Sequence, residues 1–88
     1  MGTDDLDDLS GVPRYLQIAA VVEREIREGA WQPGQAAPSK TVLSQRFGVA
    51  GETARHAQRH LAERGLVVSV PGVGMVVTPR DRWPASQD

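Results

Sequence analysis

The stretch SQRFGVAGETARHAQRHLAERGLV, residues 44–67, brings two helical patterns together with almost no chain between them. Gly48 is suited to the positive φ that ends the first of these helices, and Val49 is expected to point inward and fix the corner. The second helix runs from about residue 51 to 64, and Gly65 ends it. A corner this short predicts a rigid helix-turn-helix pair whose second helix projects at a fixed angle.

The residues upstream of this pair predict another helix and a loop. From Pro13 to Gly29 apolar residues recur at three- and four-residue steps, which is typical of an amphipathic helix. Residues 30–38 contain two prolines and a glycine and are expected to form a loop from which Trp31 reaches the core. Ser39 then caps the first helix of the pair. The apolar sides of the two paired helices are expected to consist of Val42, Leu43 and Phe47, and of Ala54, Ala57, Leu61 and Ala62.

The residues downstream predict a hairpin. Two β-branched runs are joined by PGVG, residues 71–74, so a hairpin with a glycine-bearing turn is expected over residues 66–78. The fold class is therefore mainly α with a small β-hairpin, a winged helix-turn-helix of three helices and a two-stranded wing. In such a fold the second helix of the tight pair lies in the major groove of DNA, with the wing at phosphates or the minor groove.

Both ends of the chain differ in composition from its centre. Residues 1–12 are acidic and show no sustained period, so they are expected to be a disordered acidic tail. Residues 13–79 would form the winged helix-turn-helix domain, and residues 80–88 a flexible C-terminal tail. The chain begins with Met and ends about ten residues after the wing. It is accordingly expected to be either a naturally short regulator or an isolated domain.

Composition excludes several classes of protein. The 88 residues contain no cysteine, which leaves no thiolate metal site, and His56 and His60 are four apart with no third ligand. We therefore expect no metal and no cofactor. Paired carboxylates and Ser/His/Asp groupings are missing from the sequence, so an enzyme is not expected. No signal peptide or membrane-length apolar run is present, which predicts a cytoplasmic protein without a membrane partner.

The distribution of charge permits a nucleic-acid partner although the net charge is −1. Four aspartates lie in the first eight residues. Between residues 11 and 82, ten Lys and Arg residues stand against six Asp and Glu residues, a net charge of +4. A modest positive excess of this kind is compatible with DNA binding but does not by itself indicate it.

The candidate DNA-binding residues follow from the predicted fold. Thr53 and His56 are three residues apart, and Arg55 and Arg59 are four apart, so each pair shares a helix face. Arginine can pair with guanine or with phosphates. Backbone N–H groups near Gly72 and Gly74 can approach a phosphate because no Cβ is in the way. The full set of candidates is Lys40, Thr41, Arg46, Thr53, Arg55, His56, Arg59, Gly72 and Gly74, with His60 as an additional candidate.

The sequence also resembles a known family. Tyr15 and Gln17 open the first helix. The residues that continue the resemblance are, in order, Gly34, Pro38-Ser39, Leu43, Arg46-Phe47-Gly48-Val49, Thr53, Arg55, Leu61, Gly65-Leu66-Val67 and Gly72-x-Gly74. Over residues 13–78 this series resembles the DNA-binding domain of the GntR family of bacterial transcription regulators. The resemblance implies a sequence-specific DNA-binding regulator, by implication a repressor, without the family's usual C-terminal effector domain. It implies double-stranded DNA as partner and no small-molecule effector site within this chain. One small module buries about 600–1,000 Å² on DNA, so useful affinity favours a homodimer on a two-fold operator. The oligomeric state stays open, because members of the family pair largely through the effector domain.

Several positions depart from the family pattern and keep a second interpretation open. The family usually has Glu-Arg where this chain has Lys40-Thr41, and Ser-Arg where it has Ala50-Gly51. Its wing usually continues Thr-Phe where this chain has Met75-Val76. The arginines of the two replaced pairs contact DNA in the family. The alternative is therefore a winged helix that binds another protein and has lost its DNA contacts.

Overall fold

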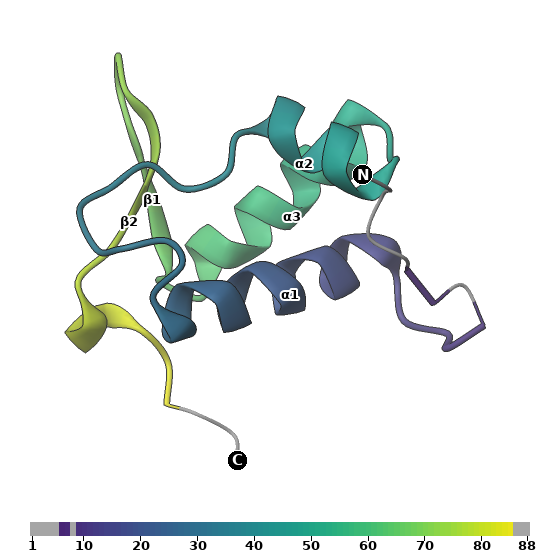
Figure 1. The fold of residues 1–88 in the computed structure, drawn as a ribbon, viewed down its shortest axis with the longest axis horizontal. Helices are drawn as coiled ribbons and strands as arrows, with labels where there is room; N and C mark the ends of the chain where they lie inside the picture. Colours follow the sequence, from purple (N-terminus) through teal and green to yellow (C-terminus); the bar gives the residue numbers. More distant parts are fainter. Residues whose placement is uncertain (1–5, 8, 86–88) are drawn as a thin grey trace.

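The structure, a computed structural model, describes residues 6–7 and 9–85 and contains the predicted elements in the predicted order. The helices are α1 (Arg14–Glu28), α2 (Lys40–Phe47) and α3 (Gly51–Glu63), and the strands are β1 (Val67–Val70) and β2 (Gly74–Val77). In Figure 1, α1 and α3 lie side by side while the hairpin stands at one end of them. None of the described helices has the length and apolar character needed to cross a bilayer. The winged helix-turn-helix fold is confirmed.

The corner between α2 and α3 is closed as the sequence predicts. Gly48 has φ of 67°, in the left-handed region, and its N–H donates to the Ser44 carbonyl. Val49 is 8% exposed, and the Ser44 hydroxyl donates to its carbonyl at 2.6 Å. The corner is therefore fixed by packing and by hydrogen bonds on both sides, and the angle between the helices cannot change freely.

The N-terminal ends of α2 and α3 differ. The Ser39 hydroxyl accepts a hydrogen bond from the Val42 N–H at 3.1 Å, which confirms the predicted cap. Ala50 precedes α3 and supplies no side-chain cap. The prediction that Val42 faces inward is wrong, because its side chain is 44% exposed. Leu43 and Phe47 are one helical turn apart and form the buried side, so the preceding residue is turned about 100° away from it.

Small residues on α3 allow α1 to pack closely against it. Ala54 and Ala57 are fully buried, and Leu61 lies on the same side of the helix. They pack against a buried stripe on α1, and Leu66 and Val77 close the core beneath the hairpin. The α1 stripe consists of Ile18, Ala19, Val22 and Ile26. Ala62 is half-buried against this core.

The loop before α2 is also attached to the hairpin. Gly34 and Ala37 donate hydrogen bonds to carbonyls of Val77 and Met75, both at 2.8 Å. Ala36 forms an isolated antiparallel bridge with Val76, so the outer edge of β2 is covered. Trp31 is half-buried against the core, as predicted. The sequence indicated a loop here but gave no signal for this pairing.

The two ends of the described chain contact the domain. Near the N-terminus the Asp7 N–H donates to Gln17 Oε1 at 2.7 Å, and Gln17 Nε2 donates back to the Asp7 carbonyl at 2.9 Å. These contacts differ from the disordered tail expected over 1–12, of which residues 1–5 and 8 lie outside the described residues.

The C-terminal end differs from expectation in the same way. A short 3-10 helix, η1 (Arg80–Arg82), follows β2, and Trp83 packs against the core with its Nε1 donating to the Thr78 carbonyl at 3.0 Å. Arg27 of α1 donates to the Pro84 carbonyl at 2.6 Å. Trp83 and Pro84 therefore lie against the domain, and only residues 86–88 of the expected flexible tail fall outside the described residues.

Candidate nucleic-acid interface

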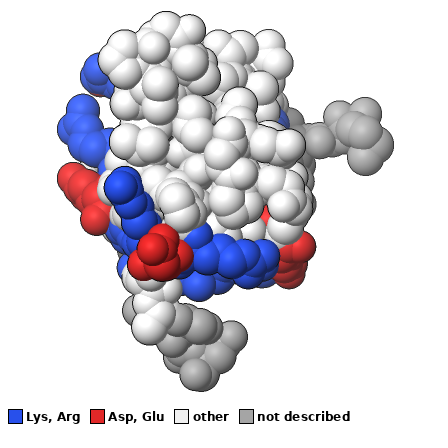
Figure 2. Space-filling model, turned by 90° about the vertical axis from the view of Figure 1, so that its left-hand side faces the viewer, with Lys and Arg blue, Asp and Glu red and all other residues white. Residues whose placement is uncertain are grey.

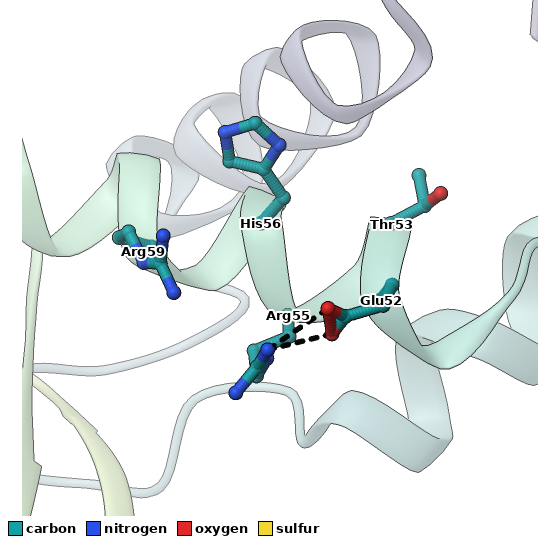
Figure 3. Close-up of a pocket in the computed structure, with 5 residues that line it drawn as sticks. All are labelled: Glu52, Thr53, Arg55, His56 and Arg59. Carbon is teal, nitrogen blue, oxygen red and sulfur yellow. Dashed lines mark hydrogen bonds and ion pairs between the residues drawn. The ribbon is translucent and has the colours of Figure 1, made fainter.

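The polar face of α3 is turned away from the body of the protein. Because the alanine side of the helix is buried, the opposite side lines an open depression formed by Glu52, Thr53, Arg55, His56 and Arg59. In Figure 3, Arg59 lies on the side of the hairpin, Glu52 and Arg55 point toward α2, and His56 points toward α1. Four of the five are predicted site residues, and the structure brings them together. Glu52 is the one that the sequence analysis did not select.

Arg55 is paired with Glu52 one turn earlier in the helix. Its Nη2 lies 2.9 Å from one carboxylate oxygen of Glu52 and 2.7 Å from the other. Both side chains are well exposed, at 55% for Arg55 and 78% for Glu52. An exposed pair of this kind contributes about 0.2–1 kcal/mol, so another acceptor can replace the carboxylate at little cost.

His56 is stacked on an aromatic ring of α1. The ring centroids of His56 and Tyr15 are 3.6 Å apart and the rings are nearly parallel, at 7°. His60 meets the edge of the same tyrosine ring, with centroids 6.0 Å apart. Tyr15 therefore restricts where the imidazole of His56 can point, and it joins the first helix to the candidate site. The sequence offered no signal for this contact, because the two residues are far apart in the chain.

Arg46 is not part of this face. Its Nη1 donates to Glu25 Oε1 at 2.9 Å, its Nη2 pairs with the other oxygen, and the guanidinium lies over the ring of Phe47. Trp31 Nε1 donates to the same carboxylate at 3.0 Å. The hydrogen bond from Arg46 lowers the pKa of Glu25. Burial opposes this shift in the pKa, and the hydrogen bond from Trp31 adds to it. Glu25 and Arg46 therefore join α1 to α2, and we call this ion pair the α1–α2 clamp.

A second clamp holds the far end of α3. Glu23 of α1 accepts hydrogen bonds from Arg64 Nε at 2.9 Å and from Arg27 Nη2 at 3.0 Å. Burial alone would raise the pKa of Glu23, but the bonds from the two arginines outweigh it and the pKa is lowered. The same interaction raises the pKa of Arg64. Helix α3 is thus attached to α1 at its C-terminal end by the Glu23 carboxylate and near its middle by the aromatic stack.

Lys40 occupies the position beside the start of α3. Its Cδ and Nζ lie 3.7 and 3.9 Å from the point where a Cβ on Gly51 would be. A positive group therefore lies near the N-terminus of α3 even though Gly51 itself carries none. Thr41, the next residue of α2, is exposed. Both predicted residues are accessible, but neither lines the depression.

The wing carries no charge. Residues 66–78 contain no Lys, Arg, Asp or Glu, and Val73 at the tip is 67% exposed. Gly72 and Gly74 have φ of 79° and 113°, and nothing lies within 4 Å of where their Cβ atoms would be. Figure 2 looks onto the hairpin side and shows an uncharged upper surface with Lys and Arg gathered at its left and lower edges. Any approach to a polyanion here depends on backbone N–H groups.

Comparison with known proteins agrees with this geometry. The model of the family described as bacterial regulatory proteins, gntR family, matches residues 14–77. The chain is 38% identical over 65 residues, 74% of its length, to the mannosyl-D-glycerate transport/metabolism system repressor MngR of Escherichia coli (strain K12). It is 30% identical over 74 residues, 84% of its length, to the transcriptional repressor NagR of Bacillus subtilis (strain 168).

Solved structures show the same fold. The DNA-binding domain of AraR in complex with operator ORX1 superposes with a TM-score of 0.78 at 33% identity, covering 89% of this chain and 99% of that one. A GntR family transcriptional regulator from Listeria monocytogenes gives 0.77 at 28% identity, covering 88% and 66%. The chain spans 27% and 30% of the lengths of the MngR and NagR repressors. On the family model and these relatives together, the chain belongs to the gntR family of bacterial regulatory proteins.

Proposed function

We propose that this chain is the sequence-specific DNA-binding module of a transcriptional regulator, with α3 in the major groove and the hairpin beside it. The observation that carries the proposal is the polar face of α3, where Thr53, Arg55, His56 and Arg59 line one open depression. An α-helix fits the major groove of B-DNA, and arginine is the side chain that most often reads guanine there.

Rigid placement of α3 supports the same conclusion. Reading bases requires side chains held in a fixed position relative to the backbone of the DNA. The Glu23–Arg64 contact, the stack of Tyr15 on His56 and the closed corner hold α3 against α1 and α2. Lys40, near the start of the helix, is placed to contact phosphate. Thr41, Gly72 and Gly74 are proposed as uncharged backbone contacts, and Arg46 is reassigned from DNA binding to the α1–α2 clamp.

Repression is the regulatory outcome that we propose. Two relatives that match this chain over most of its length are named as repressors. A bound domain that covers an operator would exclude other proteins from it. One small module buries about 600–1,000 Å² on DNA, so we further propose that two copies bind a two-fold operator.

The proposal is tested by titrating the protein with fluorescently labelled duplex DNA of random sequence. We expect a dissociation constant in the micromolar range that rises steeply between about 50 and 200 mM salt, because phosphate contacts release counterions. Arg55→Ala should weaken binding by about 5- to 100-fold with an unchanged circular dichroism spectrum. Arg24→Ala is the matched control, since Arg24 lies on the solvent side of α1 opposite its buried stripe.

Two results would contradict the proposal. A folded wild type that does not bind duplex DNA at low salt would favour the protein-binding alternative. Equal losses for Arg24→Ala and Arg55→Ala would show that binding depends on total charge and not on the face of α3.

A further inference from the structure

Glu52 is an acidic residue on a face that is proposed to meet a polyanion. Among the five residues that line the depression it is the one acid, and its side chain is 78% exposed. A carboxylate in this place repels phosphate and lowers affinity for DNA in general. It also lies in the first turn of α3, the part of a recognition helix that reaches base edges in helix-turn-helix proteins. Its position therefore matters for which bases are bound.

The contacts of Glu52 tie it to Arg55. Both of its carboxylate oxygens lie within 3 Å of a single nitrogen, Nη2 of Arg55. A guanidinium has five N–H donors arranged as a fork, so one carboxylate on one nitrogen leaves donors for another acceptor. Figure 3 shows the two side chains next to each other outside the ribbon of α3, with dashed lines joining the carboxylate of Glu52 to Arg55. The pair thus presents an acceptor next to donors.

We infer that Glu52 and Arg55 together read one G·C base pair, an inference that rests on the proposed function. In the major groove guanine presents two acceptors, N7 and O6, and the paired cytosine presents the N4 amino donor next to them. Arg55 donates to guanine, and Glu52 accepts from cytosine N4. The donors of Arg55 therefore face the acceptors of guanine, and the acceptors of Glu52 face the donor of cytosine.

Glu52 and Arg55 discriminate between base pairs because A·T and C·G place the wrong hydrogen-bonding groups opposite them. An A·T pair places the adenine N6 donor where Arg55 needs an acceptor, and a reversed C·G pair exchanges the two sides. In either case the Glu52 carboxylate faces an acceptor or a phosphate, so no hydrogen bond offsets its repulsion from the DNA. Glu52 thus lowers binding to all sequences but lowers it least at the matching pair, so that it acts as a specificity-determining residue.

The experiment is a selection of duplexes with a randomised core by the wild-type protein, followed by affinity measurements on the selected duplex and on single base-pair variants of it. Four variants are compared with the wild type: Glu52→Ala, Glu52→Gln, Arg55→Ala and Glu28→Ala. Glu28 is exposed at the end of α1, and its replacement changes the net charge as Glu52→Ala does. Circular dichroism confirms that each variant is folded.

We expect one G·C position at which replacement by A·T weakens wild-type binding by about 10- to 100-fold. Glu52→Ala should reduce that preference without abolishing it, because Arg55 still pairs with guanine. Both Glu52 variants should bind random duplex more tightly than the wild type does. Arg55→Ala should relax the same position while losing affinity. Glu28→Ala should leave the base preferences unchanged.

Three outcomes would overturn the inference while leaving the proposed function in place. The first is that Glu52→Ala binds every duplex more tightly with an unchanged pattern of base preferences. The second is that the Glu52 and Arg55 variants relax different positions. The third is that the wild type binds duplex DNA without base preference at any G·C position. A folded wild type that binds no duplex at low salt would instead refute the proposed function itself.

Discussion

Replacing Arg46 by alanine should destabilise the domain and leave its DNA contacts in place. The guanidinium donates to both oxygens of Glu25 and lies over Phe47, and the two charged side chains are 28% and 21% exposed. Exposed ion pairs contribute about 0–1 kcal/mol, whereas breaking a fully buried pair costs about 3–5 kcal/mol. This pair lies between these limits, so we expect a loss of about 1.5 kcal/mol.

That loss can be measured as a change in melting temperature. For a domain of this size 1 kcal/mol corresponds to about 4–8 °C, so Arg46→Ala should melt about 6–12 °C below the wild type. Arg55→Ala is the matched comparison, because its pair with Glu52 is exposed and should cost about 0.5 kcal/mol or less, no more than about 4 °C. Circular dichroism melts give these values, and fluorescence anisotropy with duplex DNA at a temperature where both variants are folded gives the affinity.

The two arginines should give opposite results. Arg46→Ala should lower the melting temperature and retain affinity, and Arg55→Ala should lower affinity and retain the melting temperature. If Arg46→Ala melted like the wild type but failed to bind DNA, the clamp would be the wrong assignment and Arg46 would belong to the interface.

Two further predictions concern stability. Gly65 has φ of 82° and an added Cβ would lie 2.6 Å from a backbone oxygen of η1, whereas Gly72 has φ of 79° and open space around it. Gly72→Ala should lower the free energy of unfolding by about 1–2 kcal/mol because of the left-handed backbone, and Gly65→Ala should lower it clearly more. Urea unfolding measures both losses, and equal losses would refute the close approach of η1. The pKa values of Glu23 and Glu25 are lowered below the ordinary 4.5, so their contribution is present above that pH and is lost as the pH falls through the lowered values. The stability difference between wild type and Glu23→Gln should therefore be complete at about pH 6 and shrink below about pH 4.5, and a difference that stays constant down to about pH 3 would contradict the clamp.

The order of the elements could be predicted from the sequence because each boundary has a local cause. Gly48 and Ser39 act on their immediate neighbours, and the two β-branched runs joined by a glycine-bearing turn are visible in the sequence without any distant partner. The exposed face of α3 followed from helical spacing alone. The structure brings the two predicted pairs, Thr53 with His56 and Arg55 with Arg59, to one surface.

The remaining features depend on contacts between residues that are distant in the chain. Whether an arginine on a helix faces solvent or an internal carboxylate is not encoded in its spacing, so the pairing of Arg46 with Glu25 could not be predicted. Tyr15 lies 41 positions before His56, and no pattern in the sequence announces their stacking. The ordering of residues 80–85 depends in the same way on Trp83 finding the core and on Arg27 reaching a backbone carbonyl. Contacts of this kind can be found only in the three-dimensional structure.

The central claim is that the polar side of α3 meets double-stranded DNA. Chemical-shift mapping of the labelled protein, titrated with a duplex oligonucleotide at low salt, tests it most directly. We predict that the largest shifts fall on residues 52–59 and on the wing tip at 71–74, while amides around Arg24 on the outer side of α1 stay unchanged. Shifts confined to another surface, with residues 52–59 unaffected, would contradict the account.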